Sequence, residues 1–179
     1  IAGFIVAVPT LVIGLFLSDV VAPTGERGLA FGSSIIMIVL SKAILGVTPL
    51  SADFNIQLHP MAFAGWVGLF VTAINLFPIG QLDGGHISYA AFGRKSTTVT
   101  VVSLIALLGL GFVTPSWFVL ASFLLIMMIV SGGLRHPPTL DEHVPLDRTR
   151  LWVAVAAAII FALCFTPTPV DIGGLTDVP

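Results

Sequence analysis

Charged residues are scarce in this sequence. They make up only 9% of its 179 residues, whereas hydrophobic residues make up 56% and the mean hydropathy is +1.08; soluble domains carry roughly 25% charged residues. With seven Lys and Arg residues and a net charge of −2, the chain has no basic cluster with which to bind nucleic acid. The single cysteine, Cys164, cannot form an intramolecular disulfide. The composition therefore predicts a protein of the lipid bilayer and argues against a nucleic-acid partner.

The apolar residues fall into windows that are long enough to cross a membrane. A transmembrane helix needs about 20 predominantly apolar residues, because each residue adds about 1.5 Å along the helix axis. We therefore predict an all-α, polytopic membrane protein with about six transmembrane helices, in which residues 1–179 form a single transmembrane domain. The windows are residues 1–22, 28–48, 60–78, 97–113, 115–131 and 151–166.

The positions of the basic residues agree with six spans that cross the membrane in alternating directions. Lys and Arg collect in cytoplasmic loops, and all but one of them here fall on the same side of the predicted membrane. We therefore expect residues 132–150 to form a cytoplasmic loop and both ends of the segment to lie outside. The residues on the cytoplasmic side are Arg27, Arg94, Lys95, Arg135, Arg148 and Arg150, and the exception is Lys42.

The third window ends within the segment NLFPIGQLDGGH, which starts at Asn75 and interrupts the helical pattern. Pro78 has no N–H, so the carbonyl of Ile74 loses its helical donor, and the three glycines lower the cost of leaving helical geometry. Within a membrane, non-helical backbone is tolerated where it is buried in protein or lines a cavity. We predict a helix broken at this segment and followed by a short helix over HISYAAFG. Asn75 is well placed to bond the freed main chain.

Asp83 is the only carboxylate between Asp53 and Asp141. An ionisable group at membrane depth costs about 2.5–3.5 kcal/mol on insertion scales and usually marks a functional site. The residue chemistry leaves three roles open for Asp83: the N-cap of the following helix, an ion or proton site, and a metal ligand. His86 is a further candidate for such a site, although none of the four histidines has the spacing of a metal-binding pair.

The pattern N-x2-P-x3-L-D-G, present as Asn75, Pro78, Leu82, Asp83 and Gly84, resembles the second signature of the site-2 protease family. These proteins are intramembrane zinc metalloproteases. The flanking stretches LHPMAFAGWVGLFVTAIN and RHPPTLDE and the opening IAGF are also similar, so that the resemblance covers nearly the whole chain. It is most similar to the branch found in archaea, cyanobacteria and chloroplasts.

The resemblance implies a role for each residue of the signature. In the family, two His of an HExxH helix and one carboxylate of the L-D-G segment hold a catalytic zinc with an open position for water. Asp83 would be the third zinc ligand, and Asn75 and Pro78 would position the substrate backbone and the helix break. Gly84 and Gly85 would form the structural turn that allows close approach. The implied reaction is hydrolysis of peptide bonds in membrane-spanning substrates.

The sequence lacks HExxH, because its four histidines are followed by PMAF, ISYA, PPTL and VPLD. Two zinc ligands and the catalytic Glu are therefore missing, and we expect this segment alone to be inactive. We interpret it as the C-terminal part of a larger protease domain whose catalytic helix lies upstream. The expected location is a multi-pass position in the cell membrane or in a thylakoid or plastid membrane.

Two other classes of function remain open on the sequence. An ion- or proton-coupled transporter could use Asp83 in the same broken helix, although we find no second broken helix that combines a Pro-Gly interruption with an acid. A non-catalytic membrane scaffold could bind substrates without cutting them.

Overall fold

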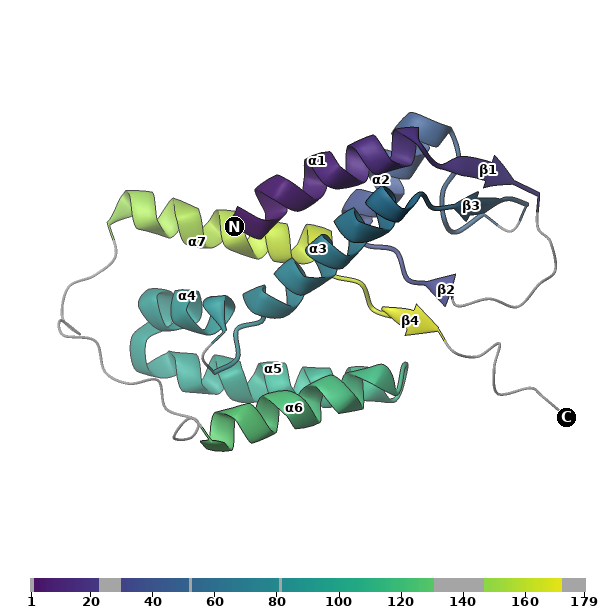
Figure 1. Ribbon diagram of the computed structural model, residues 1–179. Coiled ribbons are helices and arrows are strands. Elements are labelled where there is room, and N and C mark those ends of the chain that lie inside the picture. Colours follow the sequence, from purple (N-terminus) through teal and green to yellow (C-terminus); the bar gives the residue numbers. More distant parts are fainter. Residues whose placement is uncertain (1, 23–29, 52, 81, 131–146, 172–179) are drawn as a thin grey trace, which may run out of the picture. The chain divides into compact units, whose positions relative to one another are not determined.

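The computed structural model describes residues 2–22, 30–51, 53–80, 82–130 and 147–171, and these residues are mostly helical (Figure 1). The prediction of a helical fold is confirmed. The α-helices are α1 (Ala2–Phe16), α2 (Ile35–Leu45), α3 (Pro60–Leu76), α4 (Asp83–Phe92), α5 (Ser96–Gly111), α6 (Ser116–Val130) and α7 (Arg148–Cys164), and a 3-10 turn, η1 (Gly93–Lys95), joins α4 to α5. The short strands are β1 (Asp19–Val21), β2 (Ala30–Phe31), β3 (Asn55–Gln57) and β4 (Val170–Asp171).

Each predicted apolar window contains a helix, and α4 is the additional short helix expected after the break. All of these helices except α7 are shorter than their windows. α2 occupies only the middle of residues 28–48, because the Ser34 side chain accepts a hydrogen bond from the Met37 N–H (3.4 Å) at its start and Gly46, with φ of 75°, ends it. Among the described residues, only the continuous stretch Asp83–Gly111 is both long and apolar enough to cross a membrane by itself.

The described chain forms two compact units: residues 1–73 with 162–179, and residues 74–161. In the first unit, α1 packs closely against α3. A Cβ atom built on Gly14 would overlap the backbone of Ala62, and one built on Gly65 would lie 2.5 Å from the Leu11 nitrogen. Small residues allow helix backbones to approach in this way, and Leu11 is completely buried at the contact.

Two antiparallel strand pairs complete the first unit, and the sequence did not predict them. β1 pairs with β3, and β2 pairs with β4. Ser18 holds the first pair in place, because its hydroxyl donates to the Gly14 carbonyl (2.7 Å) and accepts from the His59 N–H (2.9 Å). Strands of two or three residues are too short to show the alternation that identifies a strand in a sequence.

Aromatic side chains pack around Trp66 in the first unit. The rings of Phe31, Phe63 and Phe70 lie with their centroids 5.1, 5.8 and 5.6 Å from that of Trp66. The indole N–H of Trp66 donates to the Gly32 carbonyl at 2.8 Å. This bond fixes the turn after β2 against α3 and satisfies the one polar group of a buried indole.

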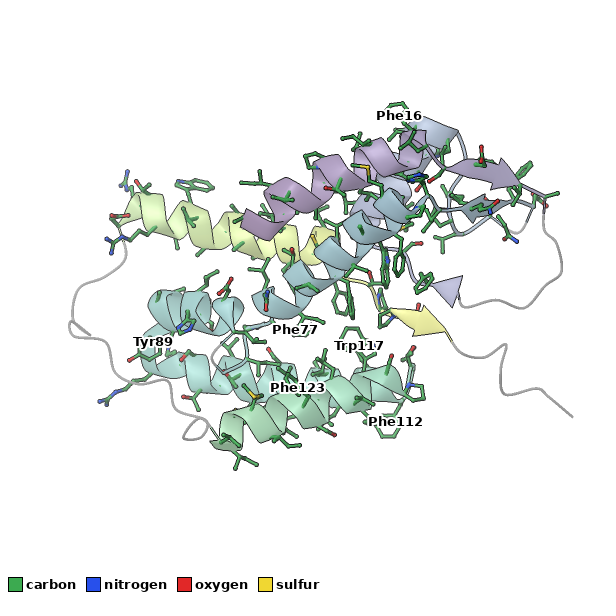
Figure 2. The ribbon with its side chains drawn as sticks, viewed as in Figure 1. Phe16, Phe77, Tyr89, Phe112, Trp117 and Phe123 are labelled. Atoms are coloured by element: carbon green, nitrogen blue, oxygen red, sulfur yellow. The ribbon has the colours of Figure 1, made fainter. Side chains whose placement is uncertain are left out.

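In the second unit, α5 and α6 form a helical hairpin, and they lie side by side (Figure 1). The turn is closed by hydrogen bonds from the Thr114 N–H to the Leu110 carbonyl and from the Trp117 N–H to the Thr114 carbonyl, both 3.0 Å. Trp117 is buried and points toward Phe77, with ring centroids 6.1 Å apart (Figure 2).

Most of the loop predicted at residues 132–150 lies outside the described residues, but its last four residues, 147–150, are described. α7 begins at Arg148, so the last three residues of the predicted loop are helical. Asp147 caps this helix: its side chain accepts from the Arg150 N–H at 2.7 Å, and its carbonyl accepts from the Leu151 N–H at 3.0 Å.

Candidate functional site

The break between α3 and α4 is the structural centre of the candidate site. α3 ends at Leu76 and α4 begins at Asp83. Because Pro78 offers no N–H, the Ile74 carbonyl accepts instead from the Phe77 N–H at 3.1 Å, a tighter turn than the helix makes. The last helical residue, Leu76, therefore lies two residues before Pro78, because the proline cannot donate the next hydrogen bond of the helix.

Hydrogen bonds within the break and from α5 hold the interrupted segment. The Ile79 N–H donates to the Phe77 carbonyl at 2.7 Å, and both of these side chains are buried. Thr100 on α5 donates from its hydroxyl to the Pro78 carbonyl at 3.2 Å. The Pro78 carbonyl thus receives a hydrogen bond from a neighbouring helix. Buried backbone polar groups need such partners.

Gly84 and Gly85 bring the start of α4 into direct contact with the backbone of the break. A Cβ atom on Gly84 would overlap the Leu76 carbonyl and lie 2.5 Å from the Phe77 carbonyl oxygen, and one on Gly85 would overlap the carbonyl oxygen of Gly80. Any larger residue would force backbone to move at either position. The two glycines therefore set how closely the chain before the break and the chain after it approach each other.

Asp83 is exposed and is the first residue of α4. The N-cap position belongs to Leu82, and no side chain caps this end of the helix. The alternative that Asp83 is an N-cap is therefore wrong. The helix begins one residue earlier than that alternative supposed, and this places the carboxylate in the first turn of α4.

The other predicted residues flank the same break. Asn75 is exposed in the last turn of α3, and Pro78 is half-buried between the helices. His86 is exposed in the first turn of α4, three residues after Asp83. The structure therefore brings Asn75, Pro78, Asp83 and the two glycines together at one helix break in the second unit.

His59 has a structural role at the start of α3. Its Nδ1 accepts a hydrogen bond from the Met61 N–H at 3.2 Å, and its carbonyl accepts from the Phe63 N–H at 3.1 Å. These bonds satisfy donors that the first turn of a helix leaves without partners. His136 and His143 lie outside the described residues.

The metal-binding side chains among the described residues do not form a complete zinc site. Catalytic zinc is held by three protein ligands, most often His with Glu or another His. Within residues 2–22, 30–51, 53–80, 82–130 and 147–171, no group of three or more His, Cys, Asp or Glu side chains could hold a metal ion. At the break between α3 and α4 the described residues supply one exposed carboxylate, Asp83, which by itself cannot hold a catalytic zinc.

Thr100 is a residue of the site that the sequence did not reveal. It lies in an apolar window, 22 residues after the carbonyl it binds, and is buried. A threonine in a helix commonly bonds the carbonyl four residues earlier, so its type and position give no sign of a tertiary partner. Only the packing of α5 on the break identifies it.

The chain is helical, and a Pro- and Gly-based break followed directly by an acid carries the pattern N-x2-P-x3-L-D-G. Residues 1–115 match the model of Peptidase family M50. The chain belongs to this family, that of the site-2 proteases, and the resemblance stated from its sequence is confirmed.

Curated relatives from Arabidopsis thaliana match different lengths of the chain. The probable zinc metalloprotease EGY1, chloroplastic, is 36% identical over 115 residues, which are 61% of this chain and 20% of the relative. The probable zinc metalloprotease EGY2, chloroplastic, is 30% identical over 171 residues, 92% of this chain and 30% of the relative. The DDT domain-containing protein PTM is 36% identical over 115 residues, 61% of this chain and 7% of the relative.

The chain thus spans less than a third of the length of each of these relatives. No solved structure gives a significant match.

Proposed function

We propose that this chain is the part of an intramembrane zinc metalloprotease that supplies the third zinc ligand, Asp83. The observation that carries the proposal is the position of this carboxylate: exposed, in the first turn of α4, directly after the break, and within the region that matches Peptidase family M50. The relatives EGY1 and EGY2 are both named as zinc metalloproteases, which supports zinc as the metal.

The residues around Asp83 would position it for this role. Gly84 packs on the Leu76 and Phe77 carbonyls, and Thr100 holds the Pro78 carbonyl, so the first turn of α4 has a defined place relative to the end of α3. A zinc ion held with the help of Asp83 would supply an activated water for hydrolysis of a peptide bond. The proposed mechanism also needs two His ligands and a Glu base, which this sequence does not contain as an HExxH motif, and the segment alone is expected to be inactive.

The surface of the second unit supports a position in the membrane. α6 contains no charged residue, and large apolar side chains on it and around it are exposed. Phe112, at the α5–α6 turn, is 86% exposed (Figure 2), and Val119, Ile129 and Val130 on α6 are each more than 70% exposed. Exposed large apolar side chains in such number are unfavourable in water and favourable in lipid. The proposed protein is therefore polytopic and acts on membrane-spanning substrates, and its chloroplastic relatives favour a plastid membrane.

The test is the replacement of Asp83 by Ala in the full-length protein, purified with its metal retained. We expect zinc content to fall and proteolysis of a membrane-spanning model substrate to be lost. Asp53→Ala is the matched control, because Asp53 is an equally exposed aspartate in the other unit. If Asp83→Ala keeps both zinc and proteolysis, the proposal is wrong. Asp83-dependent ion uptake in proteoliposomes without a zinc requirement would instead indicate a transporter.

A second candidate function is a membrane module that binds substrates without cutting them. It is favoured by one observation: a relative that matches as well as EGY1 is named as a DDT domain-containing protein and not as a protease. The sequence encoded upstream of Ile1 distinguishes the two, because a protease needs an HExxH helix with its Glu. A full-length protein that binds its substrate and lacks this Glu would establish the non-catalytic function.

A further inference from the structure

A pocket of about 370 Å³ lies within the second unit, beside the break. It is lined on one side by the end of α3, the break and α4, and on the others by α5 and α7. Of the side chains that line it, only that of Ser88 is polar. Its lining includes Pro78, Gly84, Ser88, Ala91, Ala154 and Ala157.

The α4 side of the pocket is formed by small residues on one helical face. Gly84, Ser88 and Ala91 follow one another at spacings of four and three residues, which places them in a row along the helix. Ala154 and Ala157 supply the α7 side. These short side chains leave the space of the pocket unfilled. Gly84, which lines the pocket, directly follows Asp83 in the chain.

Ser88 is the polar group of this pocket, and it is unsatisfied. The side chain is only 5% exposed, and its hydroxyl oxygen is fully buried without a hydrogen-bond partner. A serine within a helix commonly bonds the carbonyl four residues earlier, but this hydroxyl does not. A buried polar group without a partner is unfavourable, so the pocket is expected to take a ligand that brings both an apolar group and a hydrogen-bonding group.

We propose that this pocket is a substrate subsite: it binds one apolar side chain of an unwound substrate segment, and the Ser88 side chain, whose hydroxyl is buried in this structure, turns toward the pocket and bonds to the main chain of that segment. The inference rests on the proposed protease function. A peptide in a regular helix has its interior N–H and C=O groups already paired, whereas an extended segment offers them. A lipid acyl chain would fill the pocket but leave Ser88 without a partner, and so the peptide is the better fit.

The size of the pocket sets the expected specificity. Its volume of about 370 Å³ is at the small end of the range for ligand sites, roughly 300–1,000 Å³. It has room for a large apolar side chain such as Leu or Phe together with a short length of main chain. Enlarging Ala91 should therefore exclude large side chains while sparing small ones.

The experiment measures binding of labelled model peptides to the full-length protein in detergent. The peptides are Leu-Ala sequences with a central Ala, Leu or Phe. Ala91→Leu should weaken binding of the Phe peptide about tenfold or more while changing that of the Ala peptide less than threefold. The matched control is Ala90→Leu, which adds the same side chain to an exposed neighbour outside the pocket. Equal effects of the two variants would overturn the proposal.

Ser88→Ala provides a second measurement that does not add volume. It should weaken all three peptides alike, about three- to tenfold, because each loses the same bond to its main chain. No change with Ser88→Ala, or displacement of every peptide by a diacyl phospholipid regardless of its central residue, would show that the pocket is not a peptide subsite. Zinc content and the effect of Asp83→Ala are read in the same preparations, so a failure of the protease function is distinguishable from a failure of the subsite.

Discussion

Replacing Gly84 with Ala tests how α4 is held against the break. A helix interior by itself favours Ala over Gly by about 0.5–1 kcal/mol. Here the added methyl group would overlap the Leu76 carbonyl and lie 2.5 Å from the Phe77 carbonyl oxygen. Overpacking of this kind costs about 1–3 kcal/mol, and the upper end applies because backbone and not a flexible side chain has to move.

The difference is a net loss of about 2 kcal/mol for Gly84→Ala, which lowers Tm by about 4–8 °C in a domain of this size. The control is Gly109→Ala in α5, where a Cβ atom would meet nothing within 4 Å. It should raise Tm by about 1–4 °C, since only the helix preference acts. Thermal unfolding of the purified full-length protein is followed by far-UV circular dichroism, with zinc content measured in parallel.

The two glycine variants should therefore shift Tm in opposite directions. Only Gly84→Ala is also expected to lower zinc content, because α4 must move and carries Asp83 with it. If Gly84→Ala raises Tm as Gly109→Ala does, the close approach of α4 to the break is not present in the protein and the reasoning fails.

Three further substitutions address single hydrogen bonds, each measured as a change in Tm of the full-length protein. Thr100→Val removes the bond to the Pro78 carbonyl and should cost about 1–3 kcal/mol, because a buried acceptor loses its partner; an unchanged Tm would contradict this. His59→Ala should cost about 1 kcal/mol through loss of the cap of α3, whereas His59→Asn should largely retain stability, since Asn is a good N-cap; equal effects of the two would rule out capping. Trp66→Phe keeps an aromatic ring but leaves the Gly32 carbonyl unpaired, again a loss of about 1–3 kcal/mol, and a neutral result would show that the bond contributes nothing.

Much of the fold was predictable because it depends on local interactions. A helix is formed by bonds between residues four apart, so apolar windows indicated where α1, α3, α5, α6 and α7 would lie. The break was predictable for the same reason, because Pro78 removes a donor within its own turn. The strand pairs were not, since β1 and β3 are short and their pairing joins segments on either side of α2.

The sequence by itself determined the helical, apolar character of this protein, the break at Pro78, and membership of the site-2 protease family through the pattern that ends in Asp83 and Gly84. Only the tertiary structure decided that Leu82 rather than Asp83 is the N-cap of α4 and that Ser88 is buried without a partner. It also decided that Thr100 holds the Pro78 carbonyl. The physical reason is range: propensity and helix breaking act over a few residues, whereas burial and cross-helix hydrogen bonds depend on which distant segments the fold brings together.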